Sequence, residues 1–317
     1  MSVARVLNDD TVGTVSIGNA GTIGNAGTIG NAGTIGNGTP GDGLTVRRMG
    51  FGAMRISGAR NGEGVRDRAE AVKLVRTVFD RGVNFFDTAN IYGYGQSEEI
   101  IAEALYPYPD GLVIATKAGF KPGKVEPGKT SLPPLGHPDH IIEECDKSLK
   151  RLRVDVIDLY QVHVPDPDVP YEDTVGAFVE LQRAGKVRHI GVSNVSVEQL
   201  AVAQSLCDVV SVQNRYNLGD RTSEQVLAAC EAQGLAFLPW APVILAGTPA
   251  AEAVNSVAAA RGVSDQAVAL AWLLRRSPMM LPIPGTSSVA HAEENIDAAW
   301  LELTDEEFAL LGSAFAA

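Results

Sequence analysis

The sequence predicts a single-domain α/β fold, a (β/α)8 TIM barrel in which eight parallel strands are surrounded by helices. From Met49 onward, short apolar runs alternate with amphipathic stretches, and this alternation is typical of a parallel sheet. The apolar runs number eight, which is the count that a closed barrel requires. Glycines such as Gly82, Gly185 and Gly234 follow the amphipathic stretches, where a helix is expected to end.

The predicted strands are short, continuous apolar runs of the kind found in sheets buried on both faces. They are residues 49–52, 83–86, 112–115, 156–160, 187–190, 209–212, 236–238 and 280–283. The clearest predicted helices between them are residues 69–81, 140–152, 174–184, 197–206, 223–233 and 264–276. An open, doubly wound dinucleotide-binding sheet is the alternative, but it needs G-x-G-x-x-G after the first strand. Gly52 is followed by Ala53 and Met54 instead, so we favour the barrel.

The first 43 residues differ in composition from the rest of the chain. Isoleucines recur every six residues from Ile17 to Ile35, within GTIGNA units. Hexapeptide β-helices have such a period, but they need several stacked coils to bury a shared face, and ordering many glycines costs backbone entropy. We therefore expect residues 1–43 to be a disordered or loosely extended tail and residues 44–317 to form the barrel. A hairpin packed against the barrel and a binding element are the alternatives for the tail.

Composition excludes several classes of protein. A net charge of −12 repels a phosphate backbone, so we expect no nucleic-acid partner. No apolar stretch is long enough to span a membrane, and no signal-peptide pattern opens the chain, so the cytoplasm is the expected location. The three cysteines are too few and too irregularly spaced for a metal site, and we expect no metal. The sequence does not indicate an oligomeric state.

Side chains capable of acid–base chemistry follow three of the predicted strands. Asp87 ends the second strand and Tyr92 follows five residues later, Lys117 ends the third strand, and His163 follows the fourth. Since active sites of such barrels lie at the carboxyl ends of the strands, we expect these four side chains to converge.

Such a set suits the reduction of a carbonyl group. The phenol of a tyrosine has an ordinary pKa near 10, and a neighbouring ammonium group, itself held by a carboxylate, favours the phenolate. A neutral imidazole can polarise the carbonyl. Lys117 alone could instead be the Schiff-base lysine of an aldolase-type barrel.

The chain resembles the aldo-keto reductase family in several motifs that occur in the expected order from about Leu44 onward. FDTANIYG at 86–93, ATK at 115–117 and DLYQVH at 158–163 look like the segments that hold the family's Asp, Tyr, Lys and His. GVSN at 191–194 and VQNRYN at 212–217 look like its cofactor-carboxamide motifs.

The resemblance implies a role for each of the four side chains. Tyr92 is the expected general acid, and Lys117 lowers its pKa. Asp87 pairs with Lys117, and His163 directs the carbonyl. The expected substrate is therefore a small-molecule carbonyl compound.

The resemblance also implies a nicotinamide cofactor. Ser193, Asn194 and Gln213 are expected to bind its carboxamide, with Trp240 stacked on the ring. The full set of expected cofactor-binding residues is Gly52, Met54, Ser193, Asn194, Gln213, Trp240, Ile283, Gly285, Thr286, Ser287, His291, Glu294 and Asn295.

Residues 283–295 follow the last strand and open a helix, where backbone N–H groups favour anions. The segment resembles the family's adenosine-phosphate segment, with Glu294 and Asn295 positioned for the adenine. Gly285 stands where the family often has Lys, and His291 where Arg is frequent. In the family, that Lys and that Arg bind the 2′-phosphate of NADP, so their absence here weakens the preference for NADP. The remaining polar side chains still suit that phosphate, and we expect NADP (NADPH) rather than NAD.

The substrate is less well defined. The connection 118–137, which contains Phe120, is longer than most and is expected to form a functional lid. Residues 104–109 and 284–291 look like those of bacterial reductases that include pyridoxal reductases, so pyridoxal is a candidate beside small aldehydes and ketones. A regulatory subunit of the potassium-channel β type, which shares the barrel and binds cofactor with little turnover, is the alternative function.

Overall fold

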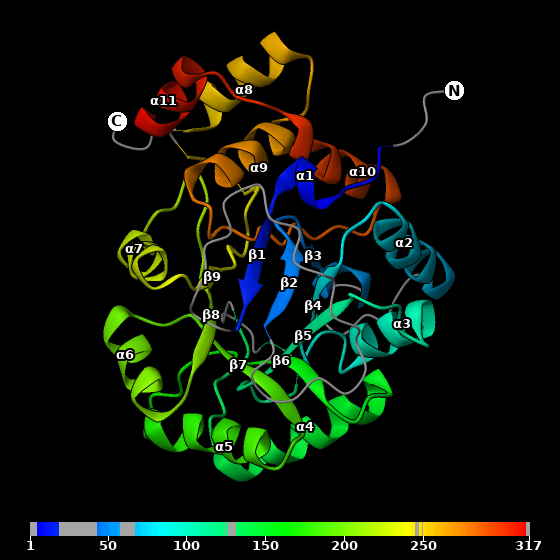
Figure 1. Ribbon diagram of the computed structural model, residues 1–317, viewed down its shortest axis with the longest axis vertical. Helices are drawn as coiled ribbons and strands as arrows, with labels where there is room; N and C mark the ends of the chain where they lie inside the picture. Colours follow the sequence, from blue (N-terminus) through cyan, green and yellow to red (C-terminus); the bar gives the residue numbers. More distant parts are fainter. Residues whose placement is uncertain are drawn as a thin grey trace.

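The computed structural model describes residues 5–18, 43–57, 67–123, 125, 131–244, 247–248 and 250–314. Within these ranges seven parallel strands lie in sequence order in one curled sheet, and helices surround it (Figure 1). This arrangement is an α/β barrel-like fold, as the alternating pattern predicted.

The sheet strands are β3 (Phe51–Gly52), β4 (Phe85–Asp87), β5 (Val113–Ala118), β6 (Ile157–Val162), β7 (Val187–Ser193), β8 (Val209–Gln213) and β9 (Ala236–Phe237). A separate antiparallel pair consists of β1 (Thr14–Ile17) and β2 (Leu44–Arg47). The helices are α1 (Asp9–Val12), α2 (Arg68–Asp80), α3 (Gln96–Leu105), α4 (Pro138–Leu152), α5 (Tyr171–Arg183), α6 (Val197–Leu206), α7 (Glu224–Gln233), α8 (Ala250–Arg261), α9 (Asp265–Arg276), α10 (Val289–Asp297) and α11 (Asp305–Ser313). Two 3-10 helices are η1 (Ala53–Ser57) and η2 (Ala298–Trp300).

Local capping explains why the predicted helices begin and end close to where the pattern places them. Helix α6 opens with a capping box, in which the side chains of Ser196 and Gln199 each accept a hydrogen bond from the other residue's backbone N–H. Helix α7 ends at Gly234, whose φ of 70° lies in the left-handed region that favours glycine.

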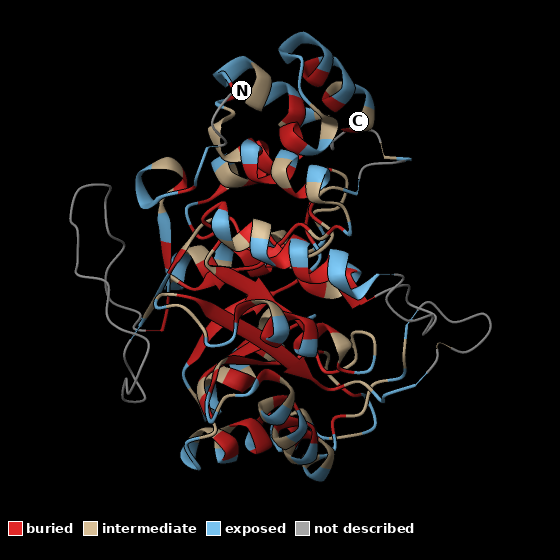
Figure 2. Ribbon diagram, turned by 90° about the vertical axis from the view of Figure 1, so that its right-hand side faces the viewer, coloured by how far each residue is buried: buried red, intermediate tan, exposed pale blue. Residues whose placement is uncertain are grey.

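The strands are buried on both faces, and the helices expose only their outer faces (Figure 2). Side chains alternate along a strand, so Phe85 on β4, Val113 on β5 and Leu159 on β6 share the interior with one another. These side chains form an apolar plug below the carboxyl ends of the strands. The inward positions nearest the carboxyl ends, Asp87 on β4, Lys117 on β5 and Gln161 on β6, are polar, and they carry the site described below.

The N-terminal segment corrects one expectation. Strand β1 pairs with β2, and the side chains of Val15 and Ile17 are buried in the apolar plug of the sheet, while Leu7 is buried against α2. Residues 5–18 are therefore ordered and not part of a disordered tail, because alternate apolar side chains give β1 one face to bury. The hairpin alternative describes this part of the chain. The repeats at residues 19–42 lie outside the described residues.

In place of the expected strand at 280–283, the structure has an irregular segment, residues 279–284, with one isolated bridge between Met280 and Phe237. The backbone of Phe237 in β9 exchanges two hydrogen bonds with this segment, both 2.9 Å long. On the other side, the carbonyls of Pro282 and Pro284 accept from the N–H groups of Gly50 (2.9 Å) and Gly52 (3.2 Å). The segment thus bonds to both edges of the sheet. It does so without a regular ladder because proline has no N–H to donate.

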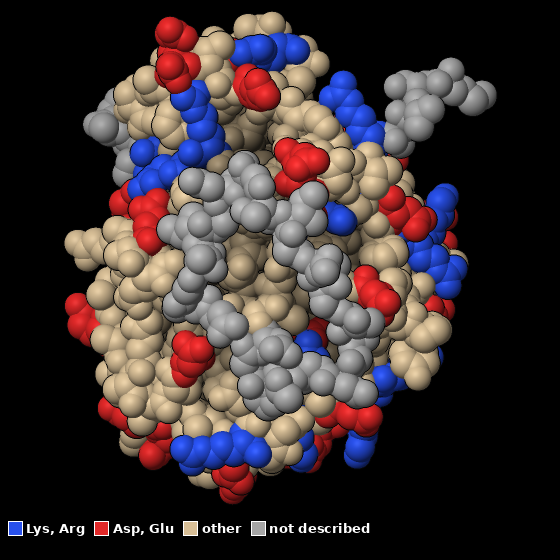
Figure 3. Space-filling view, viewed as in Figure 1, with Lys and Arg blue, Asp and Glu red and all other residues tan. Residues whose placement is uncertain are grey.

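Charge is mixed on the surface. On the face seen in Figure 3, basic and acidic side chains lie interspersed and do not gather in a patch of one sign. In the described ranges, no helix has the length and apolar character needed to cross a membrane. The three cysteines are free thiols, two of them buried.

Candidate active site

The structure brings the four predicted catalytic side chains together at the carboxyl ends of β4, β5 and β6. The ammonium nitrogen (Nζ) of Lys117 donates to Asp87 Oδ2 at 2.7 Å and lies 3.5 Å from the phenolic oxygen of Tyr92. The rings of Tyr92 and His163 meet edge to face with their centroids 6.0 Å apart. One phenol, one ammonium, one carboxylate and one imidazole therefore share a single cluster.

Lys117 is held so that one of its N–H groups faces the phenol. Besides Asp87, its Nζ donates to the carbonyl of Thr88 at 2.7 Å, and an ammonium group has three N–H donors. Two are therefore occupied by fixed acceptors, and the third is directed to the oxygen of Tyr92. This geometry lets Lys117 stabilise a phenolate without moving.

The charge state of Lys117 argues against the aldolase alternative. Burial lowers the pKa of the fully buried Lys117 ammonium, but the negative charges of Asp87 and of the Tyr92 phenolate outweigh burial and raise it above its ordinary value. A Schiff-base lysine must be a neutral amine to attack a carbonyl. Lys117 is instead stabilised as a cation, which suits an electrostatic role.

Asp87 has two further partners that the sequence analysis missed. Its Oδ1 accepts from the side-chain amides of Gln213 on β8 (2.7 Å) and Gln161 on β6 (3.2 Å). A signal for Gln161 exists in the sequence, since it is a polar residue two positions before His163, near the end of the strand. A period of two places both side chains on the same face.

His163 lies directly after β6 and is buried. Burial, and then the charge of Lys117, lowers the pKa of its imidazole well below the ordinary value, so the ring is neutral at pH 7. A neutral imidazole keeps one N–H to donate. The ring of Phe120 packs edge to face on it with centroids 4.7 Å apart, and so forms one wall beside the imidazole.

A stability measurement can test the neutral state of His163. Because its folded-state pKa is depressed, its contribution to stability is complete above the unfolded pKa near 6.5 and is lost as pH falls below that value. We expect acidification from pH 7 to pH 5 to reduce the free energy of unfolding more in wild type than in His163→Gln, which cannot titrate. Denaturant unfolding at both pH values measures the difference, and equal losses in the two proteins would contradict a neutral buried imidazole.

The expected lid at 118–137 is anchored where the structure describes it. Leu135 N donates to Gly119 O at 2.8 Å and Lys121 N to Pro133 O at 2.9 Å. These two hydrogen bonds join the two ends of the connection and so hold Phe120 against His163. The middle of the connection, residues 124 and 126–130, lies outside the described residues.

A second group of predicted residues lies beside the tetrad. Asn194 donates through Nδ2 to the carbonyl of His163 (2.9 Å) and to the hydroxyl of Ser193 (3.0 Å), and its Oδ1 accepts from the indole N–H of Trp240 (3.0 Å). Both N–H groups of Asn194 are thus engaged within the protein, while Oδ1 keeps one lone pair for a ligand. The guanidinium of Arg215, which the sequence analysis did not single out, lies 5.6 Å from the centre of the Trp240 ring.

A third group lies where β3 meets residues 283–285. A Cβ atom on Gly52 would lie 2.6 Å from the carbonyl oxygen of Ile283, and one on Gly285 would lie 2.6 Å from that of Gly52. The two backbones therefore approach closely only because both residues are glycine. The absence of a lysine at position 285 has a physical reason, since its side chain would meet the backbone of β3.

Helix α10 begins directly after this contact. Ser288 caps it by accepting from His291 N, at 3.4 Å, and the first helical N–H groups face outward as on any helix. Of the predicted residues here, Ser287, His291 and Glu294 are exposed, Met54 is half-buried, and Thr286 and Asn295 are buried.

Comparison with known proteins decides the family. The model of the aldo/keto reductase family matches residues 48–315. The chain belongs to the aldo-keto reductase family. It is 42% identical to an uncharacterized oxidoreductase of Schizosaccharomyces pombe over 84% of this chain and 86% of that protein.

Two further relatives are informative. This aldo-keto reductase is 39% identical to the pyridoxine 4-dehydrogenase of Escherichia coli, over 84% of this chain and 94% of the relative. Among solved structures, an aldo-keto reductase of Klebsiella pneumoniae in complex with NADPH matches with a TM-score of 0.72 and 27% identity, covering 86% of this chain and 92% of that one.

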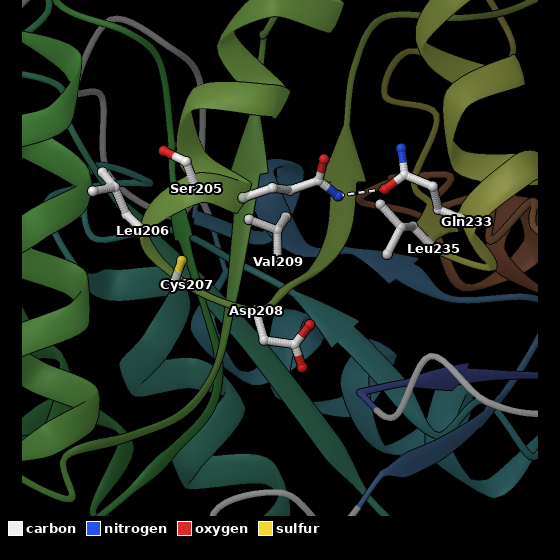
Figure 4. A pocket seen from close by; sticks show the side chains of 8 residues that line it. Ser205, Leu206, Cys207, Asp208, Val209, Gln233 and Leu235 are labelled. Carbon is white, nitrogen blue, oxygen red and sulfur yellow. Dashed lines mark hydrogen bonds between the residues drawn. The ribbon is translucent and has the colours of Figure 1, made fainter.

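A hollow at the other end of this aldo-keto reductase carries no comparable chemistry. It measures about 540 Å³ and lies between the end of α6, the start of β8 and the end of α7 (Figure 4). Gln204 and Gln233 hydrogen bond at its rim. Burial, and then Asp208, raises the pKa of the Cys207 thiol to about 11, so the thiol stays protonated near neutrality and is a poor nucleophile.

Proposed function

We propose that this aldo-keto reductase reduces an aldehyde or ketone to an alcohol with NADPH, and that Tyr92 supplies the proton. The observation that carries the proposal is the orientation of Lys117. Asp87 and the carbonyl of Thr88 hold its ammonium group so that the remaining N–H is directed to the phenol of Tyr92. The neutral imidazole of His163 lies beside that phenol. The NADPH complex of the Klebsiella pneumoniae relative supports the choice of cofactor.

The residues present fit such a cofactor. The paired glycines at 52 and 285 let β3 and residues 283–285 pack closely together beside the start of α10, and the start of α10 offers N–H groups to a phosphate. Ser193, Asn194 and Gln213 would hold the carboxamide, and Trp240 would stack on the ring. When bound, NADPH supplies the hydride.

The chain's own residues perform the remaining steps. His163 donates a hydrogen bond to the substrate oxygen and orients it, and Tyr92 gives its proton to that oxygen as negative charge develops there. Lys117 stabilises the phenolate left on Tyr92 until a solvent proton replaces the one transferred. The carbonyl carbon thus gains a hydride, the oxygen gains a proton, and the product is the alcohol.

We further propose that residues 279–284 serve as the eighth strand, closing a (β/α)8 barrel within residues 44–317. Their hydrogen bonds to both β9 and β3 support closure. In this view β1 and β2 form a hairpin that covers the amino-terminal end of the barrel, as their burial with the interior side chains indicates.

Pyridoxal is the proposed first substrate to test. The 39% identical pyridoxine 4-dehydrogenase supports it, and the ring of Phe120 beside His163 would give an aromatic substrate a ring to pack against. Initial rates with pyridoxal, methylglyoxal, sugars and benzaldehydes, each with NADPH and NADH, test the proposal. We expect turnover with NADPH. Tight NADPH binding without turnover of any carbonyl would contradict the proposal and favour a cofactor-binding regulatory subunit.

Cofactor choice can be tested at His291. Its exposed side chain on the first turn of α10 is the proposed contact of the 2′-phosphate. His291→Ala should therefore weaken NADPH binding about 10- to 100-fold, the worth of one hydrogen bond to a charged group, and leave NADH binding unchanged. Fluorescence titration with both cofactors measures the two Kd values. His137→Ala, an equally exposed histidine before α4, is the matched control. Equal weakening of both cofactors by His291→Ala would remove the case for this contact.

A further inference from the structure

Gln161 occupies an unusual position beside the catalytic carboxylate. It lies on β6 in register with Lys117 on β5, is fully buried, and donates to Asp87 Oδ1 at 3.2 Å. The same oxygen accepts from Gln213 on β8 at 2.7 Å. The carboxylate therefore receives two neutral amide donors on the oxygen that faces away from the lysine.

The other end of the Gln161 amide has no partner. Its Oε1 is buried and accepts no hydrogen bond from any described residue. A buried acceptor without a donor costs stability, and an apolar side chain of similar length would avoid that cost. The inward neighbour on β6, Leu159, is apolar and packs in the interior plug. The amide at position 161 is therefore best explained by what its N–H group does.

The N–H group acts on the charge of Asp87. Hydrogen bonds to a carboxylate favour its ionised form, and an ionised Asp87 is what stabilises the ammonium of Lys117. Gln213 has a second demand on its amide, because its proposed role at the nicotinamide carboxamide would engage the amide oxygen or the second N–H and pull the side chain toward the cofactor. Gln161 has no such second role, and it stays on Asp87 when Gln213 turns to the cofactor.

We propose that Gln161 is a positioning residue for carbonyl reduction, which keeps Asp87 ionised and aimed at Lys117 while Gln213 is engaged by the cofactor. The inference rests on the proposed reductase function. The titratable groups that face this cluster are Lys117 on β5, Tyr92 in the loop after β4 and His163 after β6. Gln161 and Gln213 are neutral at all pH values.

The test compares Gln161→Met, Gln161→Glu and the control Gln182→Met. Gln182 donates to the Arg188 carbonyl from α5 (2.9 Å), outside the site. For Gln161→Met we expect kcat to fall about 10- to 100-fold, the worth of one hydrogen bond to a charged group, with the aldehyde KM unchanged. Its melting temperature should hold or rise, because the unsatisfied oxygen is gone. The control should keep its kcat.

Gln161→Glu adds a second measurement, the pH dependence of kcat, which should not change if Gln161 has only a structural role. The introduced carboxyl group repels Asp87 when ionised, but when protonated it can donate an O–H to Oδ1, and its pKa is raised by the neighbouring like charge. The kcat of this variant relative to wild type should therefore rise as pH falls from 8 to 6. The same ratio for Gln161→Met should stay flat.

Each outcome has a distinct meaning. A wild-type enzyme that reduces no carbonyl with NADPH overturns the proposed function and this inference together. An active wild type with unchanged kcat in Gln161→Met overturns the inference alone. A variant whose kcat and melting temperature fall together, or a flat pH ratio for Gln161→Glu, would assign Gln161 a structural role and also overturn it.

Discussion

Tyr92→Phe should lower kcat for aldehyde reduction by roughly 10²- to 10⁴-fold, the usual contribution of a positioned general acid. The substitution removes one oxygen atom and leaves the ring against His163, so the site keeps its shape while losing its proton donor. NADPH should bind with an unchanged Kd, because none of the proposed cofactor contacts involves the phenol. Initial rates followed at 340 nm and a fluorescence titration measure the two quantities.

The chain offers a matched control for this variant. Tyr94 lies two residues further along the same loop and is about half exposed, at 48% of its full accessible surface. Tyr94→Phe makes the same chemical change and should keep kcat near that of wild type. If Tyr92→Phe also retained a kcat within about threefold of wild type, far short of a general acid's contribution, another group would have to supply the proton.

Lys117→Met should abolish activity and also destabilise the fold. The Nζ of Lys117 is the partner of the buried carboxylate of Asp87, and removing one partner of a buried ion pair costs about 3–5 kcal/mol because the other charge stays buried. The two glutamines on Asp87 Oδ1 soften this loss, so we expect about 3 kcal/mol, at the lower end of that range. Urea unfolding and steady-state rates measure the two effects.

The double variant Lys117→Met with Asp87→Asn separates stability from catalysis. An asparagine keeps a carbonyl oxygen for Gln161 and Gln213 but carries no charge, so most of the lost unfolding free energy should return. Activity should not return, because no cation faces Tyr92. Recovery of kcat along with stability would show that Lys117 is needed only for folding and would contradict its role in the proton transfer.

The tetrad could be predicted because each member follows a strand whose apolar run is visible in the sequence. Asp87 is the last residue of β4, Lys117 is the last but one of β5, and His163 directly follows β6. Parallel strands bring such positions to one edge. Tyr92 is five residues from Asp87, within a loop short enough to keep it there. Strand register alone thus assembles three of the four side chains, and a short connection adds the fourth.

Pairings between segments that lie far apart in the sequence were harder to predict. Strand β1 pairs Val15 with Val46 across the glycine-rich repeats, and no local pattern reveals a partner so far along the chain. The composition of the repeats led to an expectation of disorder that also covered the ordered residues before them. In the last segment, Pro282 and Pro284 have no N–H group to donate. Their carbonyls accept hydrogen bonds from Gly50 and Gly52 instead, and the sequence alone does not predict these bonds.

Hydrogen-bond partners within the site also escaped prediction. The resemblance assigned Gln213 to the cofactor, whereas its amide lies 2.7 Å from Asp87 Oδ1. Gln161 and the carbonyl of Thr88 complete the coordination of the ion pair. Both lie within the motifs DLYQVH and FDTANIYG, but the resemblance assigned neither of them a role. Period and spacing place side chains on a face, but which atoms meet depends on the curvature of the sheet.

Isotope transfer tests the central claim most directly. Wild-type protein should be incubated with pyridoxal and NADPH deuterated in turn on each face of the nicotinamide C4, and the alcohol analysed by mass spectrometry. A reductase of the proposed type transfers deuterium from one face only, giving an alcohol with one deuterium on the former carbonyl carbon and an equal amount of NADP⁺. An alcohol without deuterium from either cofactor, or no alcohol while NADPH remains tightly bound, would contradict hydride transfer by this protein.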